Sequence, residues 1–330
     1  MKILVIFTGG TIGSSSSGDY ISPDGGRPYK LLDLYTQKYG AAAEFDTACP
    51  YTVLSENMDC SYYPRLLAAV NEGLSAGYDG IIVTHGSDTL QYTAAMLSYT
   101  LGLDCAPVLL VSSNYVLEDP RANGLTNMAA AVDFIAGKYG RGVFVPYANS
   151  GEPCRIHRGS RLMPHQPFDD CVYSFGDSHF GHFKDGNFIR NKDYSEKNSG
   201  IRYEIGDNCS AESGVLWINP YPGMKYPPVP ADCRAVLLGS YHSGTLCTES
   251  ESLRAFSEDA KSKGVPLYLT GASDGQDYES CREYEKLGIR VLPAASPIAM
   301  YIRLWLESVS KSTLGMEVPV GGDYAGSEKG

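Results

Sequence analysis

Several features that mark other classes of protein are scarce in this sequence. Its 330 residues carry 27 lysines and arginines against 38 aspartates and glutamates, which gives a formal net charge of −11 at pH 7. Nucleic acids and anionic membrane surfaces attract proteins through basic patches, so we expect neither as a partner. No apolar run is long enough to cross a membrane. The composition therefore favours a small-molecule partner.

The nine cysteines are odd in number and scattered, and no two of them form a CxxC pair. This usage argues against a zinc ribbon and a disulfide framework, and it predicts reduced thiols and a cytoplasmic location. The N-terminal sequence MKILVIFTGG has one lysine and only a short apolar run. A signal peptide needs a longer apolar region and a small-residue cleavage site, so we expect a first buried strand here.

What the sequence does contain is an alternation of strand-like and helix-like segments. Short apolar runs, typical of buried parallel strands, occupy residues 3–7, 80–83, 107–111 and 142–145. Helix-like segments lie between them, at residues 63–74, from residue 89 onward, and at residues 127–136. This order predicts an α/β fold with a doubly wound, Rossmann-like N-terminal domain.

Residues 181–208 interrupt the alternation. They are polar and poor in aliphatic side chains, as a linker is. Strand-like runs resume at residues 214–218, 235–238, 266–269 and 289–292, with helices expected at 253–262, 278–287 and 298–308. We therefore predict an N-terminal domain over residues 1–185, a linker over 186–212 and a smaller C-terminal α/β domain over 213–330. The Gly-rich tail after Met316 is expected to be mobile.

The sequence TGGTIG, at residues 8–13, directly follows the first predicted strand. In open α/β sheets, ligands bind beyond the carboxyl ends of the strands. The paired glycines allow a sharp turn and a close approach of the backbone to a ligand, and the turn presents the hydroxyl of Thr11. The spacing is not GxGxxG and no Gly-Lys-Ser/Thr follows, so the dinucleotide-binding and phosphate-binding loops are excluded.

Two further hydroxyl-rich segments follow strand-like runs. THGSDTL, at residues 84–90, begins where the strand over 80–83 ends, and SENM, at residues 55–58, closes a strand-like run over 51–54. Asp88 and Thr89 are also suitable helix caps, and a lone His85 is more typical of a structural histidine than of a catalytic one. Together the three segments predict that hydroxyls and carboxylates converge on one small polar ligand.

These motifs resemble those of the bacterial type I/II L-asparaginase family. TGGTIG is similar to its first signature, which makes Thr11 the expected nucleophile, and HGSDTL to its second, which assigns Ser87 and Asp88. Tyr20 corresponds to the catalytic tyrosine on the loop after the first signature. The likeness extends to residues 119–132, 215–224 and 235–245. By the same resemblance, the substrate-binding residues are Gly10, Ser55, Glu56 and Gly86.

The resemblance implies hydrolysis of the side-chain amide of L-asparagine to L-aspartate and ammonia, with no cofactor and no metal. An amide is a poor electrophile, so an acyl-enzyme on Thr11 would divide the reaction into two easier steps. Backbone amides near the glycine turn and the Ser87 region would stabilise the oxyanion. Asp88 would hold the α-ammonium group of the substrate. The family also implies a homodimer or homotetramer with active sites at a subunit interface.

One element of the family pattern is missing. Between residues 154 and 176, where the family has a lysine that completes its second catalytic triad, this sequence contains no lysine. Arg161 lies near that position, but a guanidinium stays protonated and cannot act as a base. His157 or His165 is a candidate substitute for the lysine.

Other functions therefore stay open beside that of an asparaginase-like amidohydrolase. Ser87 stands in place of the family's usual threonine, and Glu56 in place of a neutral side chain. Another small amide, such as glutamine, is an alternative substrate. An amino-acid-binding or regulatory homologue with little turnover is an alternative class of function. His179 and His182 form an HxxH pattern, but it lacks the glutamate of a metallopeptidase helix, so we expect no metal site.

Overall fold

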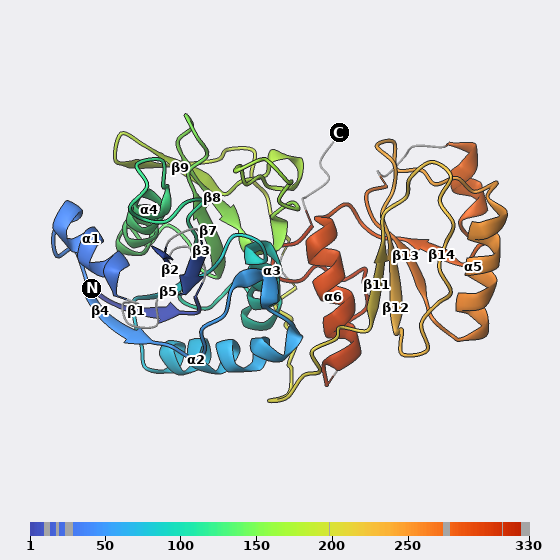
Figure 1. Cartoon of the computed structure of the whole chain (residues 1–330), viewed down its shortest axis with the longest axis horizontal. Coiled ribbons are helices and arrows are strands. Elements are labelled where there is room, and N and C mark those ends of the chain that lie inside the picture. Colours follow the sequence, from blue (N-terminus) through green and yellow to red (C-terminus); the bar gives the residue numbers. More distant parts are fainter. Residues whose placement is uncertain are drawn as a thin grey trace.

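The first strand, β1 (Lys2–Phe7), is apolar after its first residue and buried from Ile3 onward, as a central parallel strand requires. It lies inside an eight-stranded sheet of order β10-β9-β8-β7-β6-β5-β1-β4 (Figure 1). The structure is a computed structural model that describes residues 1–9, 14–17, 20–23, 29–197, 199–272, 278–311 and 313–324.

Five neighbouring strands of this sheet run parallel. They are β1, β4 (Glu44–Ala48), β5 (Gly80–Thr84), β6 (Val108–Val111) and β7 (Val143–Tyr147). Three strands with antiparallel pairing extend one edge, namely β8 (Cys154–Arg158), β9 (Gly181–Lys184) and β10 (Asn187–Arg190). The strand order reverses at β1, which has β4 on one side and β5 on the other. Open α/β sheets bind ligands at such a switch point.

Helices cover both faces of the large sheet. α1 (Lys30–Tyr39) and α4 (Gly124–Ala136) pack on one face, in a core that includes Ile3 and Val5 of β1. α2 (Tyr63–Ser75) and α3 (Leu90–Leu101) pack on the other face, in a core that includes Leu4 and Ile6. Alternate β1 side chains enter opposite cores because successive residues of a strand point to opposite faces. The predicted doubly wound N-terminal domain is confirmed.

A second sheet of four parallel strands forms the smaller domain, in the order β11-β12-β13-β14. The strands are β11 (Val215–Ile218), β12 (Ala235–Leu238), β13 (Leu267–Leu269) and β14 (Ile289–Val291). One face is covered by α5 (Glu251–Ser262) and the other by α6 (Pro297–Val309).

Helix α6 joins the two domains. It stands between the two sheets in Figure 1. Leu306 of α6, Leu97 of α3 and Leu237 of β12 belong to one hydrophobic core. The C-terminal domain is therefore packed onto the large domain through a shared apolar layer.

Shorter elements complete the architecture. They are the hairpin strands β2 (Ser14–Ser17) and β3 (Tyr20–Pro23) and the 3-10 helices η2 (Ser55–Asn57), η3 (Cys60–Tyr62), η4 (Gly159–Arg161), η5 (Phe175–Asp177) and η6 (Glu279–Glu283). Within the described segments, every helix is too short or too polar to span a bilayer.

Three sequence expectations were wrong. Residues 51–54 are not a strand, because only Val53 forms an isolated bridge, to Gly9, and the strand in this part of the chain is β4. Residues 181–190, expected to open a polar linker, form the β9–β10 hairpin. Its Phe188 packs edge to face on Phe134 of α4, with ring centroids 5.6 Å apart. Residues 278–287 contain the short η6 and turns instead of an α-helix.

The expectation of a mobile tail was also wrong for the described residues up to 324. Val320 and Asp323 are fully buried, and the Asp323 carboxylate accepts a 2.8 Å ion-pair hydrogen bond from Arg303 of α6. Buried charges need partners, and this pair explains why an acidic residue is tolerated in the core. Residues 325–330 lie outside the described residues.

Candidate active site

The ends of β1 and β5 are tied together at the carboxyl edge of the large sheet. The Thr8 hydroxyl, directly after β1, donates a 2.6 Å hydrogen bond to the carbonyl of Thr84, the last residue of β5. The Thr8 carbonyl in turn accepts a 3.0 Å bond from the amide of Val53. The segments after β1, before η2 and after β5 are thereby brought to one place.

Gly9 permits the closest of these approaches. It has φ +104°, and a Cβ placed on it would lie 2.3 Å from the carbonyl oxygen of Val53. Side chains other than glycine rarely adopt that conformation and would collide with the backbone there. The first glycine of the TGGTIG motif is therefore required for backbone packing beside β1.

The clearest side-chain link in this region joins Ser55 to Asp88. The Ser55 hydroxyl donates a 2.7 Å hydrogen bond to Oδ2 of Asp88, and the Thr89 hydroxyl donates a 3.0 Å bond to the Ser55 carbonyl. Ser55 is buried, whereas Asp88 is exposed. The buried Ser55 thus orients the Asp88 carboxylate, which stays accessible to solvent and to a ligand.

His85 supports this turn from inside the protein. Its Nδ1 lies 2.8 Å from the Gly86 carbonyl, and its Nε2 lies 2.9 Å from the Thr93 hydroxyl. A carbonyl can only accept, so Nδ1 carries the proton and Nε2 accepts from Thr93. Burial lowers the pKa of His85 to about 4. The imidazole is therefore neutral and holds the turn that carries Gly86 and Ser87.

A pocket of about 430 Å³ opens beside these groups. It is lined by Ser87, Asp88, Asn114, Tyr147 and residues 165–170. Asn114 follows β6 and Tyr147 ends β7, so the pocket lies along the carboxyl ends of parallel strands. Asn114 is held by Asn123, since the side-chain oxygen of each accepts a hydrogen bond from the backbone amide of the other, at 3.0 and 3.1 Å.

Of the three residues considered for the missing lysine, His165 lies at this pocket. Its ring packs edge to face on Tyr147, with centroids 6.4 Å apart. Its Nε2 is buried and has no hydrogen-bond partner among the described residues. Near neighbours include Asp169, whose pKa is lowered chiefly by hydrogen bonds from the side chain and the backbone amide of Cys171.

The other two residues are used elsewhere. His157 on β8 is fully buried, with Nδ1 2.8 Å from the Ser174 hydroxyl, and burial lowers its pKa to about 3. Arg161 is also fully buried and donates to the carbonyls of Gly322 at 2.7 Å and Tyr324 at 3.0 Å. Arg161 thus anchors the C-terminal segment and does not line the candidate pocket.

The remaining predicted residues are placed as follows. Glu56 is exposed on η2 beside Ser55, but it is not among the residues that line the pocket. Gly86 lies in the turn held by His85. Tyr20 begins β3, and its side chain is outside the described part of the structure. Thr11 and Gly10 lie outside the described residues.

Sequence reasoning missed Asn114 and Tyr147 as pocket residues. A signal for Asn114 was present, because it closely follows the strand predicted at 107–111, at the edge where ligands bind. Tyr147 carried a weaker signal, since the predicted strand ended at residue 145 and the real one at Tyr147. Within the described ranges, no three His, Cys, Asp or Glu side chains group in a way that could hold a metal ion.

A protein-family model described as "Asparaginase, N-terminal" matches residues 2–186, more than half of the chain. Among curated proteins, the chain is 32% identical over 164 residues to a glutamyl-tRNA(Gln) amidotransferase subunit of Methanosarcina barkeri. That match covers 49% of this chain but only 38% of the relative. The protein of the same name from Metallosphaera sedula is 24% identical over 322 residues, covering 92% of this chain and 71% of its own length.

Among solved structures, the chain is similar to the thermostable L-asparaginase from Thermococcus kodakarensis. The TM-score is 0.76 at 24% sequence identity, and the alignment covers 99% of this chain and 100% of the other. At this level of identity the likeness establishes the fold. It extends over both domains, in agreement with the shared core at α6.

Proposed function

This chain belongs to the asparaginase family of amidohydrolases, and on that basis we propose that it hydrolyses the side-chain amide of L-asparagine to L-aspartate and ammonia. The observation that carries the proposal is the 2.7 Å hydrogen bond between Ser55 and Asp88, beside a pocket that Asp88 lines with Ser87 and His165. Segments far apart in sequence meet there at the switch point of an α/β sheet, where such folds bind ligands.

In the proposed complex, Asp88 holds the α-ammonium group of the substrate. A carboxylate that is already oriented by Ser55 loses less freedom when it binds a cation. Gly10, Ser55, Glu56 and Gly86 are proposed to contact the amino-acid end of the substrate. A second carboxylate at Glu56 would add attraction for the ammonium group and repel an acidic ligand.

The reaction is proposed to proceed through an acyl-enzyme. The Thr11 hydroxyl attacks the amide carbon, its proton passes by way of Tyr20 to the leaving nitrogen, and the C–N bond breaks to release ammonia. Water then attacks the ester carbon, returns a proton to the Thr11 oxygen and releases L-aspartate. Backbone amides around the glycine turn and the Ser87 region stabilise the oxyanion, and one such donor typically contributes about 3 kcal/mol.

His165 is proposed to replace the family lysine as the base near Ser87. The proposal is supported by the position of His165 on the wall of the same pocket. Its buried Nε2 has no hydrogen-bond partner among the described residues. A neutral imidazole can accept a proton, whereas the Arg161 guanidinium cannot. Replacement of His165 by asparagine should lower kcat by about a hundredfold or more. A His165→Asn variant with the wild-type kcat rules this role out.

The decisive experiment is ammonia release from L-asparagine, measured with the full chain and with Thr11→Val. Valine keeps the size of threonine but has no hydroxyl, so turnover should fall to background. Thr52→Val changes an exposed threonine that does not line the pocket, and this matched control should keep wild-type turnover. Wild-type turnover in Thr11→Val contradicts the proposed nucleophile.

The curated relatives suggest a second candidate, a component of an amidotransferase. They carry that name, but the chain matches only 38% of the Methanosarcina barkeri protein. The net charge of −11 argues against direct contact of this chain with an RNA. Turnover of L-asparagine by the isolated chain favours a free-standing hydrolase. Turnover of L-glutamine in preference to L-asparagine favours the alternative substrate.

The missing lysine supports a third candidate, an amino-acid-binding or regulatory homologue with little turnover. Residues 154–176 contain no lysine, and loss of a general acid or base typically slows a reaction by about 10²- to 10⁴-fold. Calorimetric titration with L-aspartate distinguishes this candidate. Tight binding together with an absence of ammonia release favours the binding protein over the enzyme.

We further propose that the chain forms a homodimer or homotetramer in the cytoplasm. Phe168 lines the pocket, and its side chain is fully exposed to solvent. Its φ of +65° is unusual for a bulky residue. An apolar ring held out in this way suits a surface that a neighbouring protomer covers. All nine cysteines are free thiols, which suits a reducing compartment. Sedimentation of wild-type and Phe168→Ser protein tests the assembly, which should weaken in the variant.

A further inference from the structure

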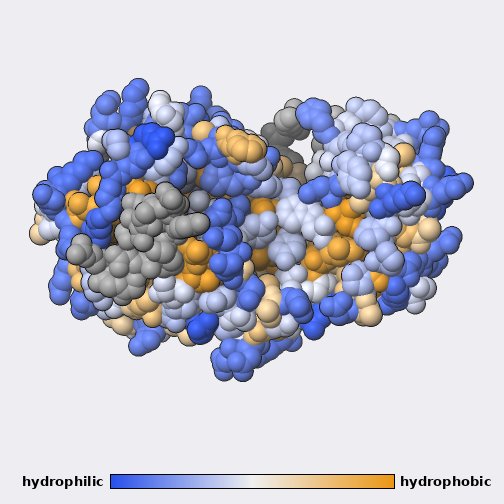
Figure 2. Space-filling model, in the orientation of Figure 1, coloured by the Kyte–Doolittle hydropathy of each residue, from blue (hydrophilic) through white to orange (hydrophobic). Residues whose placement is uncertain are grey.

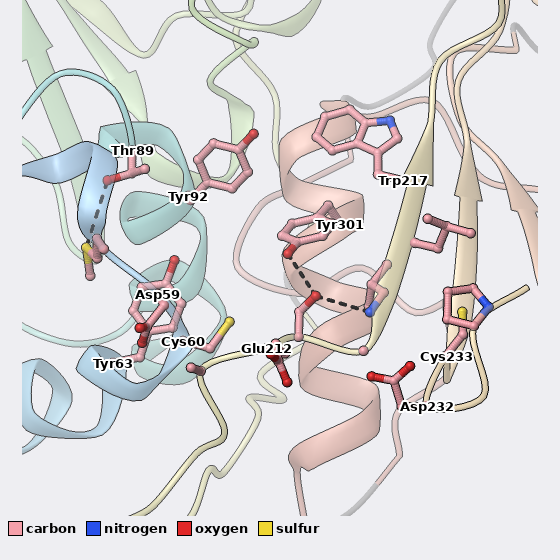
Figure 3. Close-up of a pocket in the computed structure, with 17 residues that line it drawn as sticks. Asp59, Cys60, Tyr63, Thr89, Tyr92, Glu212, Trp217, Asp232, Cys233 and Tyr301 are labelled. Carbon is pink, nitrogen blue, oxygen red and sulfur yellow. Dashed lines mark hydrogen bonds between the residues drawn. The ribbon is translucent and has the colours of Figure 1, made fainter. Parts of the chain in front are cut away.

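A second pocket, of about 640 Å³, lies between the two domains and shares no lining residue with the candidate active-site pocket (Figure 3). Tyr63 of α2 and Tyr92 of α3 line it from the large domain. Trp217 of β11 and Tyr301 of α6 line it from the small domain. Figure 2 shows pale and orange residues gathered where the two lobes of the molecule meet. The proposed hydrolysis uses none of these aromatic side chains.

Three of the rings form a continuous row from α3 to β11. Tyr92 meets Tyr301 edge to face, with centroids 5.8 Å apart, and Tyr301 stacks on Trp217 at 5.8 Å and 25°. The Tyr301 hydroxyl donates a 2.9 Å hydrogen bond to Ser213, which holds the ring in position. Aromatic faces carry partial negative charge, so they attract cations as well as apolar groups.

The charged residues that line this pocket are all acidic. They are Asp59, Glu212 and Asp232, and no described lysine, arginine or histidine lines it. The ion pairs found among the described residues do not include Glu212 or Asp232. Figure 3 shows both carboxylates on the side of the pocket opposite Tyr92. Aromatic faces together with uncompensated carboxylates are complementary to a protonated amine on an apolar body.

The wall of this pocket is hydrogen-bonded to the candidate active site. Thr89 lines the interdomain pocket, and its hydroxyl donates to the carbonyl of Ser55, the residue that orients Asp88. Met58, which also lines the pocket, directly follows η2, and its sulfur lies 3.6 Å from the Thr93 hydroxyl. The backbone amide of Met58 also donates a 3.2 Å hydrogen bond to the Ser55 carbonyl. Thr89 and Met58 thus connect the wall of the interdomain pocket to Ser55, whose hydroxyl orients Asp88.

We propose that the interdomain pocket binds a small organic ammonium ion with an apolar body, and that its occupancy changes the affinity of the Ser55–Asp88 site for its amino acid. The binding of the ammonium ion rests on the pocket alone, whereas its coupling to the Ser55–Asp88 site rests on the proposed function. Coupling of this kind is reciprocal, so an amino acid bound at Asp88 changes the affinity for the amine by the same factor.

Calorimetric titration of the full chain with phenethylamine tests the binding. Its matched control ligand is 3-phenylpropionate, which has a similar apolar body and a negative charge. Phenethylamine should bind with a single saturable isotherm and 3-phenylpropionate should not. The double variant Glu212→Gln with Asp232→Asn should weaken amine binding at least about tenfold, as expected for loss of charge pairing. Glu249→Gln with Glu258→Gln, two exposed acidic residues outside the pocket, makes the same change in net charge and should leave binding unchanged.

Tryptophan fluorescence gives an independent readout of the site. The chain has two tryptophans, of which Trp305 is 1% exposed in the core and Trp217 lines the pocket. Phenethylamine should change the emission of the wild type and leave that of Trp217→Phe unchanged. Equal binding of amine and carboxylate, equal binding by the Glu212/Asp232 double variant, or no saturable amine binding at millimolar concentration overturns the proposed site.

The coupling is measured as the Kd of L-aspartate with and without saturating phenethylamine. The two values should differ at least about threefold in the wild type, and the ratio should approach one in Thr89→Val. Equal values in the wild type overturn the coupling. If the amine binds as described and L-aspartate does not bind at all, the proposed active site is wrong while the ammonium site is supported.

Discussion

The hydroxyl of Ser55 donates a 2.7 Å hydrogen bond to Oδ2 of Asp88, across 33 positions of sequence. Ser55 belongs to a 3-10 helix after an extended segment, and Asp88 to the turn between β5 and α3. The two meet because β1 and β5 are adjacent parallel strands and the 51–54 segment is bridged to Gly9 after β1. This contact orients the carboxylate that we propose binds the substrate's ammonium group.

Removal of the Ser55 hydroxyl should weaken amino-acid binding. A hydrogen bond to a charged group contributes roughly 1.5 to 3 kcal/mol, and Asp88 is exposed, so water partly replaces the lost donor. We expect Ser55→Ala to raise the Kd of L-aspartate about tenfold and Asp88→Asn to raise it further. Ser75→Ala, which changes an exposed serine on α2, is the control. Calorimetric titration measures the three values, and an unchanged Kd in Ser55→Ala speaks against the positioning role.

Alanine at Gly9 should destabilise the fold. The new Cβ would lie 2.3 Å from the Val53 carbonyl oxygen, in a backbone conformation with φ +104°. We expect Gly9→Ala to lower the free energy of unfolding by about 3 kcal/mol or more. Gly77→Ala, at φ +79° with no atom within 4 Å of the new Cβ, is the matched control. It should lose only about 1 kcal/mol from the strained φ. Urea unfolding measures both, and equal losses contradict the proposed collision.

His157 should make the protein sensitive to acid. Burial lowers its pKa from the ordinary 6.5 to about 3, so above pH 6.5 it is neutral in both the folded and the unfolded chain. As the pH falls below 6.5 the unfolded chain takes up the proton first, and stability is lost until the folded pKa is reached. This residue should account for a loss of about 3 kcal/mol between pH 7 and pH 4.

The test compares urea unfolding at several pH values for the wild type and His157→Gln. The variant should lose less stability on acidification, although its absolute stability also changes because the bond to Ser174 is altered. His242→Gln, an exposed histidine, should follow the wild-type pH dependence. If the free energy of unfolding falls with pH to the same extent in the wild type and in His157→Gln, His157 does not cause the predicted loss of stability.

The buried pair of Arg303 and Asp323 should matter far more than a surface pair. Both side chains are 0% exposed, and the Arg303 guanidinium would lose its carboxylate in Asp323→Ala. Removal of one partner of a buried pair typically costs about 3 to 5 kcal/mol. Glu283→Ala breaks the exposed pair with Lys286 and should cost under about 1 kcal/mol. Thermal unfolding of the two variants measures the loss of stability in each. Similar losses would show that the C-terminal segment contributes little to the stability of the fold.

Much of the fold could be read from local patterns. The strands at β1, β5 and β6 and the helices α2 and α6 were placed to within about two residues, because buried strands and amphipathic helices leave strong periodic signals. β4 was missed, since it is an edge strand with exposed and half-buried residues instead of an apolar run. The β9–β10 hairpin was missed because Ile189 is its only aliphatic residue, and because Phe134 of α4, on which its Phe188 packs, is distant in sequence.

The sequence by itself determined the α/β class, the family and the candidate residues at strand ends, since these depend on local periodicity and on motifs a few residues long. Only the tertiary structure decided which candidates meet. It brings Ser55 to Asp88 and places His165 at the pocket. It buries His157, which is hydrogen-bonded to Ser174, and Arg161, which donates to a carbonyl of the C-terminal segment. The physical reason is that contacts between distant residues depend on strand order and on which buried polar groups need partners.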